Sequence, residues 1–249
     1  MALVVGTSGW QYADWRGAFY PGGLTQRAWL ERYSAEFPTV EVNNAFYRLP
    51  ERSVFERWRD HTPDGFVMAV KVSRYLTHIK RLREPDEPVA RLVERAAGLG
   101  DRSGPYLLQL PPNLQADAAR LDACLAAFPS GARVAVEPRH DSWFTDEVRS
   151  VLRARGAALC WADRGGRPLT PLWRTARWGY LRLHEGTASP RPSYGRGALG
   201  TWLDRIDDAW PGARRSDVFV YFNNDHGAAA VRNARTLRRM ARRRGLPTR

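Results

Sequence analysis

An apolar run that ends abruptly in charged residues recurs along the chain, and it is clearest within Arg133–Trp143 (RVAVEPRHDSW). The run Val134–Val136 is typical of a buried strand. Pro138 ends its hydrogen-bonding ladder because proline has no N–H to donate. About eight such runs occur, and most precede a segment with helical periodicity. This alternation predicts an α/β fold, and 249 residues suit one (β/α)8 barrel or one doubly wound domain.

The apolar runs and the helical periodicity set the expected order of elements. The expected strands are Leu3–Gly6, Thr39–Asn44, Phe66–Val72, Tyr106–Leu110, Val134–Val136, Ala157–Ala162, Trp178–Leu183 and Asp217–Phe222. The expected helices include Thr25–Phe37, Glu87–Leu99, Asp117–Phe128, Leu199–Trp210, Ala228–Arg243 and one between Thr145 and Gly156. The link after the sixth strand is rich in glycine and proline and has no helical pattern. We therefore predict a single TIM-like (β/α)8 barrel domain over residues 1–249 that lacks a regular helix after strand 6.

The net charge of +13 comes almost entirely from arginine, since Lys71 and Lys80 are the only lysines. A positive field of this kind attracts anionic substrates and polyanions such as nucleic acid. Arginine-rich chains are also common products of genomes with a high GC content, so a purely compositional origin stays open. The basic stretch at Arg238–Arg244 suits the C-terminal end of a helix dipole and does not by itself indicate nucleic-acid binding.

The lack of a recognisable targeting signal and the cysteine usage both predict a cytoplasmic protein. No basic segment is followed by a long apolar one, and no apolar run approaches the roughly 20 residues of a membrane span. Cys124 and Cys160 lie in apolar surroundings without metal-motif spacing, as expected for reduced thiols. We expect no membrane association, and the sequence identifies no protein partner.

Polar and charged residues at the ends of the strands form the candidate site, because TIM barrels place their active sites there. The candidate catalytic residues are Glu41, Lys71, Glu137, His140, Asp163 and His184. The candidate substrate-binding residues are Ser8, Trp10, Asn43, Gln109, Arg139, Trp143, Arg182, Tyr194, Asn223, Asn224 and Asp225. Lys71 is expensive to bury unless it is paired, and we expect Glu41 to be its partner. So many ionisable groups favour a functional site, although a satisfied polar network in the core is the alternative.

Several long motifs resemble one family. The segments GTSGW, DWRGAFYP, TVEVNNAFYRLP, LLQLPP, AVEPRHDSW, RLH and YFNND are similar to the domain of unknown function family 72, also called YecE-like. The resemblance runs from Gly6 to about Leu237 in the order of the family. It implies a TIM-barrel-like fold and no agreed activity. The chain departs from the family at Asn44, Pro138 and Glu185, where the family usually has serine, phenylalanine and glycine, and these departures leave the charged residues in place.

The first functional hypothesis is an enzyme that uses acid–base chemistry on an anionic substrate, either phosphorylated or derived from a nucleotide. Lys71, Arg139 and Arg182 would bind the anion. Glu41 or Glu137 would move protons together with a histidine, because burial and neighbouring charges can tune such groups for proton transfer. This isomerase, lyase or hydrolase chemistry needs no metal, and we predict no cofactor.

Two other classes stay open. A metal-dependent enzyme similar to phosphoesterases or endonucleases would use carboxylate and imidazole ligands, and the candidates are Glu137, Asp163, His184 and Asp225. A nucleic-acid-binding protein without catalysis would contact phosphates through its positive charge and stack bases on aromatic rings, for which the candidates are Trp10, Trp15, Tyr47 and Trp143. A Schiff base at Lys71 ranks lower, because pairing with a carboxylate works against a low lysine pKa.

Overall fold

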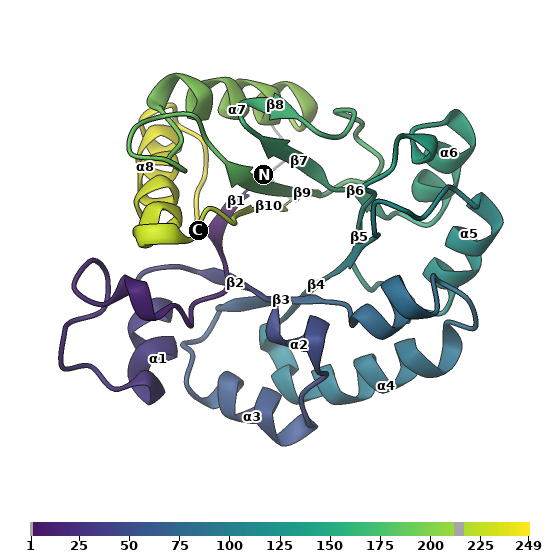
Figure 1. Cartoon of the computed structure of the whole chain (residues 1–249), viewed down its shortest axis with the longest axis horizontal. Coiled ribbons are helices and arrows are strands. Elements are labelled where there is room, and N and C mark those ends of the chain that lie inside the picture. Colours follow the sequence, from purple (N-terminus) through teal and green to yellow (C-terminus); the bar gives the residue numbers. More distant parts are fainter. Residues whose placement is uncertain (1, 212–216) are drawn as a thin grey trace. The chain divides into compact units, whose positions relative to one another are not determined.

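The structure is a computed structural model that describes residues 2–211 and 217–249. Strands paired in parallel alternate with helices along the chain (Figure 1), which confirms the predicted TIM-like α/β fold. The chain forms two compact units. Unit 1 comprises Met1–Glu41, Ala162–Leu169 and Arg177–Arg249, and unit 2 comprises Val42–Trp161 and Thr170–Ala176. The single domain over residues 1–249 stays a prediction.

The strands of unit 1 are arranged around β1. In spatial order they are β2 (Thr39–Val42), β1 (Ala2–Ser8), β10 (Asp217–Phe222), β9 (Gly179–Glu185), β7 (Trp161–Arg164) and β8 (Arg167–Pro168). The pairings of β1 with β2 and β10, and of β10 with β9, are parallel, whereas β8 returns antiparallel to β7. The last residue pair between β1 and β2 is Ser8 with Glu41, so the backbones of these two candidate residues lie side by side in the sheet.

Gly6 allows β1 and the start of β2 to approach closely. A Cβ atom at this position would lie 2.1 Å from the carbonyl oxygen of Thr39. Any side chain would therefore push the two strands apart.

Helices cover the strands of unit 1. They are η1 (Ala13–Trp15), η2 (Gln26–Ala28), α1 (Trp29–Ser34), α7 (Arg196–Ala209), η6 (His226–Ala228) and α8 (Ala229–Arg243). Figure 1 shows α7 and α8 beside β9 and β1. The expected helix over Thr25–Phe37 is shorter, because its first turn is a 3-10 helix and the regular part ends at Ser34. Its apolar residues Trp29, Leu30, Tyr33 and Phe37 are nevertheless all buried.

In unit 2 the strands follow one another in sequence order. They are β3 (Val67–Lys71), β4 (Ser103–Gln109), β5 (Val134–Glu137) and β6 (Ala158–Leu159), paired in parallel. The helical elements are α2 (Asn44–Tyr47), α3 (Arg52–Asp60), η3 (Tyr75–Ile79), α4 (Asp86–Ala96), η4 (Ala97–Arg102), α5 (Ala118–Ala126), η5 (Asp141–Trp143) and α6 (Asp146–Ala154). Figure 1 shows α3 to α6 on one side of these strands.

The sixth predicted strand differs from expectation because it is split. β6 pairs with β5 in unit 2, and β7 belongs to the sheet of unit 1. Among the described residues no helix follows β7 before β9, as predicted. The irregular stretch instead completes the edge of β6, since Thr175 Oγ1 donates to Ala157 O at 2.7 Å and accepts from Leu159 N at 2.8 Å.

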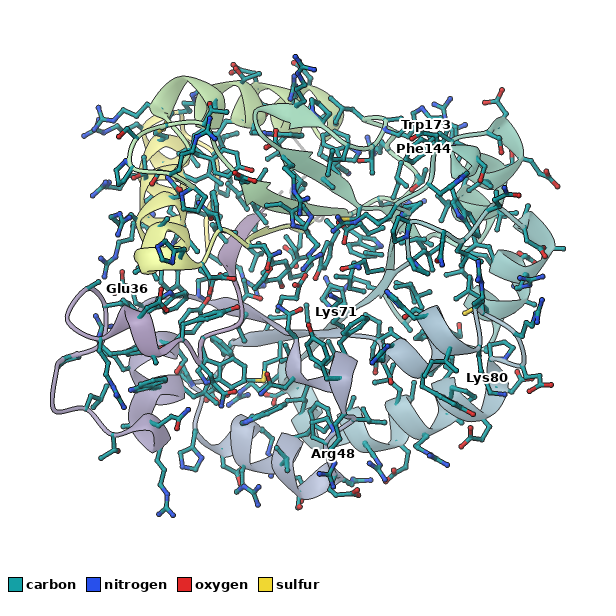
Figure 2. All side chains as sticks on the ribbon, viewed as in Figure 1. Glu36, Arg48, Lys71, Lys80, Phe144 and Trp173 are labelled. Carbon is teal, nitrogen blue, oxygen red and sulfur yellow. The ribbon has the colours of Figure 1, made fainter. Side chains whose placement is uncertain are left out.

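The same irregular stretch is anchored by aromatic contacts within unit 2. Trp161 Nε1 donates to Trp173 O at 3.0 Å. The rings of Phe144 and Trp173 lie edge to face with centroids 6.5 Å apart, near α6 (Figure 2). Arg149 of α6 lies over the Trp173 ring at 5.2 Å. A helix is therefore not needed to cover this part of the sheet.

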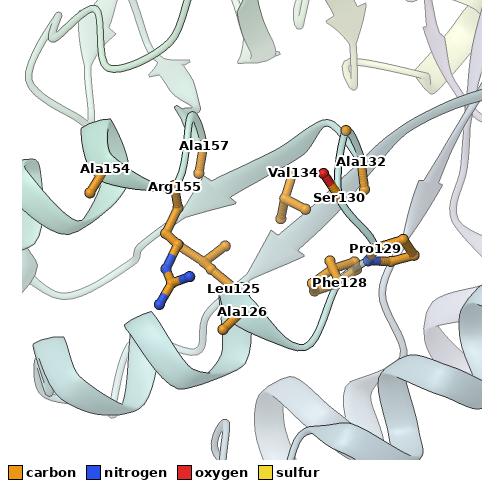
Figure 3. Close-up of a pocket in the computed structure, with 11 residues that line it drawn as sticks. Leu125, Ala126, Phe128, Pro129, Ser130, Ala132, Val134, Ala154, Arg155 and Ala157 are labelled. Carbon is orange, nitrogen blue, oxygen red and sulfur yellow. The ribbon is translucent and has the colours of Figure 1, made fainter.

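A pocket of about 380 Å³ opens at the N-terminal ends of β5 and β6 (Figure 3). Leu125, Phe128, Val134 and Arg155 are among the residues that line it. It lies at the opposite ends of these strands from Glu137, and TIM barrels bind substrates at the C-terminal ends. The position of this pocket therefore does not match that of a TIM-barrel substrate site.

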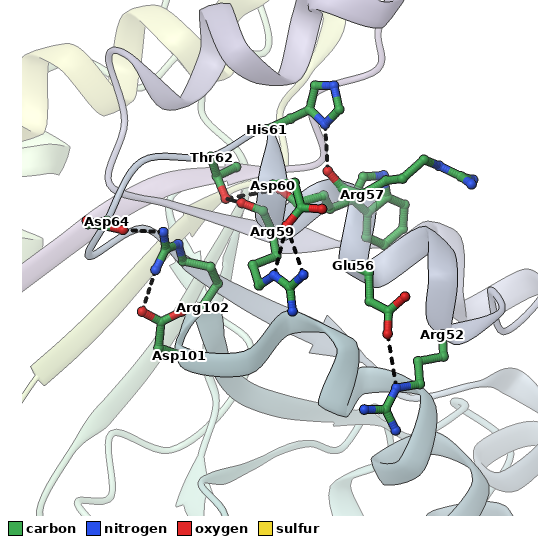
Figure 4. Close-up of polar contacts among 11 residues, drawn as sticks. Arg52, Glu56, Arg57, Arg59, Asp60, His61, Thr62, Asp64, Asp101 and Arg102 are labelled. Atoms are coloured by element: carbon green, nitrogen blue, oxygen red, sulfur yellow. Dashed lines mark hydrogen bonds and ion pairs between the residues drawn. The ribbon is translucent and has the colours of Figure 1, made fainter.

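Polar contacts at the end of α3 fix how the chain enters β3, which carries Lys71 (Figure 4). Thr62 Oγ1 donates to the carbonyl oxygen of Arg59 at 2.9 Å and so closes the last turn of the helix. Arg102, the last residue of η4 and directly before β4, forms ion pairs with Asp64 and Asp101. These contacts tie the α3–β3 connection to the neighbouring strand.

Candidate functional site

The centre of unit 1 is a buried group of three side chains, Glu41 of β2 with Tyr180 and Arg182 of β9. Arg182 Nη2 lies 2.8 Å from Glu41 Oε1, and the Tyr180 hydroxyl donates to Glu41 Oε2 at 2.7 Å. Two strands separate β2 from β9 in the sheet. Because neighbouring strands lie about 4.8 Å apart, direct contact between the outer pair requires a strongly curved sheet with these side chains on its concave face.

Aromatic rings of β10 pack next to Tyr180 of this group. The rings of Tyr180 and Tyr221 have centroids 5.1 Å apart, and Phe219 stacks on Tyr221 at 6.4 Å. The Tyr221 hydroxyl shares a hydrogen bond of 2.8 Å with Thr39 Oγ1. Glu41 is fully buried and Arg182 is 1% exposed. An ion pair in such surroundings interacts strongly because water does not screen it.

Asp225 follows β10 and is the carboxyl group best suited to exchange protons. Burial is the main cause that raises its pKa to about 7. The nearby Tyr12 hydroxyl opposes this shift, and the negative charge of Glu41 adds to it. The Tyr12 hydroxyl donates to Ser8 O, and Trp15 Nε1 donates to the carbonyl oxygen of Asp225 at 2.9 Å. The residue is therefore held in place and lies close to its protonation midpoint near neutral pH.

Three buried oxygen atoms at these strand ends lack a hydrogen-bond partner among the described residues. They belong to the side chains of Ser8, Asn224 and Asp225. Folded proteins rarely leave buried polar atoms unsatisfied, so such atoms indicate a place for bound water or a ligand. Unit 1 thus combines an ionisable carboxyl group with unsatisfied hydrogen-bonding atoms.

His184, near the end of β9, and Asn223, directly after β10, lie next to each other. Asn223 Nδ2 is 2.9 Å from His184 Nδ1. An amide nitrogen can only donate, so Nδ1 accepts this bond and a neutral His184 carries its proton on Nε2. The contact orients the ring and does not use Nε2.

Asp163 and Tyr194 are joined in a buried network that holds the loop after β9. The Tyr194 hydroxyl donates to Asp163 Oδ1 at 2.7 Å, and Trp202 Nε1 donates to Oδ2 at 3.3 Å. Burial raises the pKa of Asp163, although both of these bonds act against the rise. Asn224 Nδ2 donates to Asn233 Oδ1 at 2.9 Å, and Asn233 also binds the backbone of Tyr194. The geometry gives Asp163 and Tyr194 a structural role, while their predicted catalytic and binding roles stay untested.

Unit 2 contains two further cations among the candidates. Arg139 Nη2 pairs with the fully buried Glu137 at 2.7 Å. Lys71 Nζ lies 4.1 Å from the ring centroid of Phe46, beside α2 (Figure 2). Burial, followed by the charge of Lys71, lowers the pKa of the neighbouring His78. Glu41 accepts hydrogen bonds from Tyr180 and Arg182, and its pairing with Lys71 stays a prediction.

The other candidate residues of unit 2 differ in their location and in their hydrogen bonds. Gln109 is in register with Glu137, so both lie at the same level of the sheet. Asn43 Oδ1 is buried without a hydrogen-bond partner among the described residues. His140 Nδ1 accepts from Ser142 N at 3.2 Å and caps the short helix η5. This cap occupies one of the two ring nitrogens that a proton-transfer role for His140 would use.

The aromatic residues considered for base stacking are mostly inaccessible. Trp10, Trp15 and Trp143 are at most 3% exposed, and Trp143 Nε1 donates to Leu114 O at 2.7 Å. Their rings pack in the core, so the structure gives no support to stacking by these three residues. Tyr47 is 76% exposed and keeps an accessible ring.

Sequence reasoning missed Tyr12 and Tyr180 as members of the site. Tyr180 is two residues before Arg182 on the same strand, so strand alternation already placed both on one face. Tyr12 lies in an aromatic loop whose residues we expected to pack, and the sequence holds no signal for its contact with Asp225.

Among residues 2–211 and 217–249, no three His, Cys, Asp or Glu side chains lie close enough together to hold a metal ion. The metal-dependent alternative therefore has no set of three protein ligands in this part of the chain. In the same residues, no helix combines the length and the apolar character that a membrane span needs.

Comparison with known proteins identifies relatives without a stated activity. YecE of Escherichia coli K12 is 32% identical over 155 residues, which are 62% of this chain and 54% of YecE, so the match spans about half of that relative. YunF of Bacillus subtilis 168 is 24% identical over 94% of this chain and 93% of its own. Both names carry the prefix UPF0759.

Solved structures agree on the fold. A DUF72 family protein from Thermotoga maritima MSB8 superimposes with a TM-score of 0.84 and 26% identity, covering 97% of this chain and 100% of that one. SacUVDE superimposes with a TM-score of 0.55 and 11% identity over 96% and 99% of the two chains, which shows likeness of fold alone. The family model described as "Protein of unknown function DUF72" matches residues 4–248. The predicted resemblance is thus confirmed, and the chain belongs to the DUF72 family.

Proposed function

We propose that this protein is an enzyme that uses acid–base chemistry on a small anionic substrate, phosphorylated or derived from a nucleotide. The observation that carries the proposal is Asp225, whose pKa of about 7 accompanies a buried oxygen without a partner among the described residues. A general acid or base works best when its pKa lies near the working pH. Asp225 replaces Glu41 in the proton-transfer role, because both oxygens of Glu41 already accept hydrogen bonds.

The neighbours of Asp225 support this role. The unsatisfied Ser8 Oγ and Asn224 Oδ1 can hydrogen-bond a substrate next to the carboxyl group. Glu41, which Tyr180 holds by a hydrogen bond, fixes the orientation of the Arg182 guanidinium before a substrate arrives. A fixed charge stabilises negative charge that develops during the reaction at no cost of rearrangement.

An anionic substrate is favoured by the charges of the whole chain and of the strand ends. The net charge is +13. In unit 2 Lys71 and Arg139 stand at the ends of β3 and β5, and each is more than three-quarters buried. Their charges add to the positive field that attracts an anion, although Arg139 is already paired with Glu137. We also propose a cytoplasmic location, because Cys124 and Cys160 are free thiols.

The first test measures the pKa of Asp225 directly by NMR of 13C-labelled aspartate carboxyl groups. The Asp225→Asn variant assigns the signal, and Asp208→Asn, an exposed aspartate of α7, is the matched control. We expect a midpoint near pH 7 that disappears only in Asp225→Asn. A midpoint below pH 5 would overturn the proposal.

The second test follows turnover of phosphorylated sugars and nucleotides by 31P and 1H NMR in the presence of a chelator. We expect Asp225→Asn to lower kcat by about 10²–10⁴-fold, the usual contribution of a positioned acid or base, while Asp208→Asn keeps the wild-type rate. A substrate that Asp225→Asn turns over at the wild-type rate, or only with an added divalent metal, would contradict the proposed mechanism.

A further inference from the structure

The outer face of α8 carries a row of exposed arginines that the proposed catalytic chemistry does not use. The row consists of Arg232, Arg239, Arg242 and Arg243, which we call the α8 basic face. Positions 232, 239 and 243 are spaced by seven and four residues, so they lie on one side of the helix. At 1.5 Å per residue the row is roughly 16 Å long.

The basic face is not neutralised by carboxylates. Within the described part of the chain, none of its four arginines forms an ion pair with Asp or Glu. Arg232 donates to Gly227 O and Arg242 to Thr248 Oγ1, and both acceptors are uncharged. Arginines elsewhere on and after α8 differ: Arg235 is paired with Glu36, and Arg244 with Asp204. The charge that remains is therefore concentrated on the outward side.

The opposite face of α8 is fully engaged in the core. Val231, Ala234, Leu237 and Ala241 are at most 1% exposed. A basic helix that binds a membrane surface inserts an apolar face between the lipids. The apolar face of this helix packs in the core, and its exposed residues are arginines. The arrangement suits a repeating array of phosphates that it can contact from outside.

We propose that the α8 basic face is a docking surface for the phosphate backbone of a nucleic acid. Each strand of a DNA duplex carries one phosphate per about 3.4 Å of helix axis, so a row of roughly 16 Å matches the axial length that about five phosphates of one strand occupy. Arginine binds phosphate through a planar fork of donors and stays charged at any physiological pH. Because these arginines would contact phosphates and not base edges, we expect binding without sequence preference. This inference does not depend on the proposed catalysis.

The test measures binding of a fluorescein-labelled mixed-sequence 20-base-pair DNA duplex by anisotropy between 50 and 200 mM salt. The variant Arg239→Gln, Arg242→Gln and Arg243→Gln removes three charges and keeps good helix formers. Each lost phosphate contact reduces the salt slope by about 0.9, so we expect the slope to fall by roughly 2.7. At 50 mM salt the Kd should rise by at least tenfold.

The matched control is Arg57→Gln, Arg83→Gln and Arg153→Gln in unit 2. These arginines are also exposed, and no ion pair is found for them among the described residues. The control lowers the net charge by the same amount but disperses the change, and we expect its Kd within about twofold of the wild type. Equal weakening in both variants would show that total charge alone causes binding and would overturn the proposal. Absence of binding by the wild type at 50 mM salt, or binding to phosphatidylserine vesicles in place of the duplex, would overturn it as well.

Discussion

Arg182→Met should destabilise the protein far more than the loss of an ordinary surface ion pair. Its charged partner Glu41 is fully buried 2.8 Å away, so the variant leaves a buried carboxylate without its cation. Two charges about 4 Å apart interact by roughly 4 kcal/mol at an effective dielectric constant near 20. Breaking one side of a buried pair typically costs about 3–5 kcal/mol, and we expect that loss here. For a chain of this size it corresponds to a decrease in Tm of roughly 6–20 °C.

The assay is a double-mutant cycle followed by urea unfolding with tryptophan fluorescence. Arg182→Met and Glu41→Leu should each be costly, while the double variant should cost less than their sum by at least about 2 kcal/mol, because it leaves no unpaired charge. The matched control is Arg155→Met. Its pair with Asp122 has similarly short contacts of 2.6 and 2.7 Å, but both side chains are more than one-third exposed. That change should cost less than about 1 kcal/mol.

Two results would refute this reasoning about Glu41 and Arg182. Additive single effects would mean that the two side chains stabilise the fold independently. A cost for Arg182→Met no larger than that for Arg155→Met would mean that burial adds nothing to the strength of the pair.

Three further predictions concern stability. Because the pKa of Asp225 is raised to about 7, its contribution to the free energy of unfolding is complete below pH 4 and is lost as pH rises through 7. Urea unfolding at several pH values should show a loss of up to about 4 kcal/mol, which Asp225→Asn should lack. A wild-type stability that does not change with pH would contradict the raised pKa. Tyr194→Phe removes a donor from a buried carboxylate and should cost about 1–3 kcal/mol in urea unfolding, whereas Tyr47→Phe, on an exposed ring, should be neutral. Gly6→Ala, whose Cβ has no room, should lower the Tm sharply, while Gly197→Ala, in open space on a helix, should raise it slightly; similar shifts in both would disprove the close approach.

The alternation of apolar runs and helical segments predicted the fold because it depends on local patterns. The strand at Val134–Val136 ends beside Pro138 as expected, and Thr145 and Gly156 begin and end α6 where capping chemistry places them. Such signals act within a few residues. They can therefore be recognised in the sequence without knowledge of long-range contacts.

The partners of charged groups were harder to predict because they depend on long-range geometry. Glu41 contacts Arg182 only because the sheet curves across β1 and β10. The residues of β2 and β9 carry no sequence pattern from which that curvature could be predicted. The split of the sixth strand follows from Thr175, which completes the edge of β6 from a stretch without regular structure. In the same way, the raised pKa of Asp225 arises from burial that only the assembled unit creates.

The pairing of β1 with β10 delays the completion of unit 1 during synthesis. Ala2 pairs with Asp217 and Thr7 with Phe222, so each partner of β1 is translated roughly 215 residues later, after about 10–40 s at 5–20 residues per second. Until then Leu3, Val4 and Val5 form an apolar strand whose β10 side has no neighbour. A nascent chain in this state presents an open edge to other chains, and the cell must shield it or tolerate some aggregation. Contacts between such distant segments also slow folding, so the time at risk extends beyond release from the ribosome.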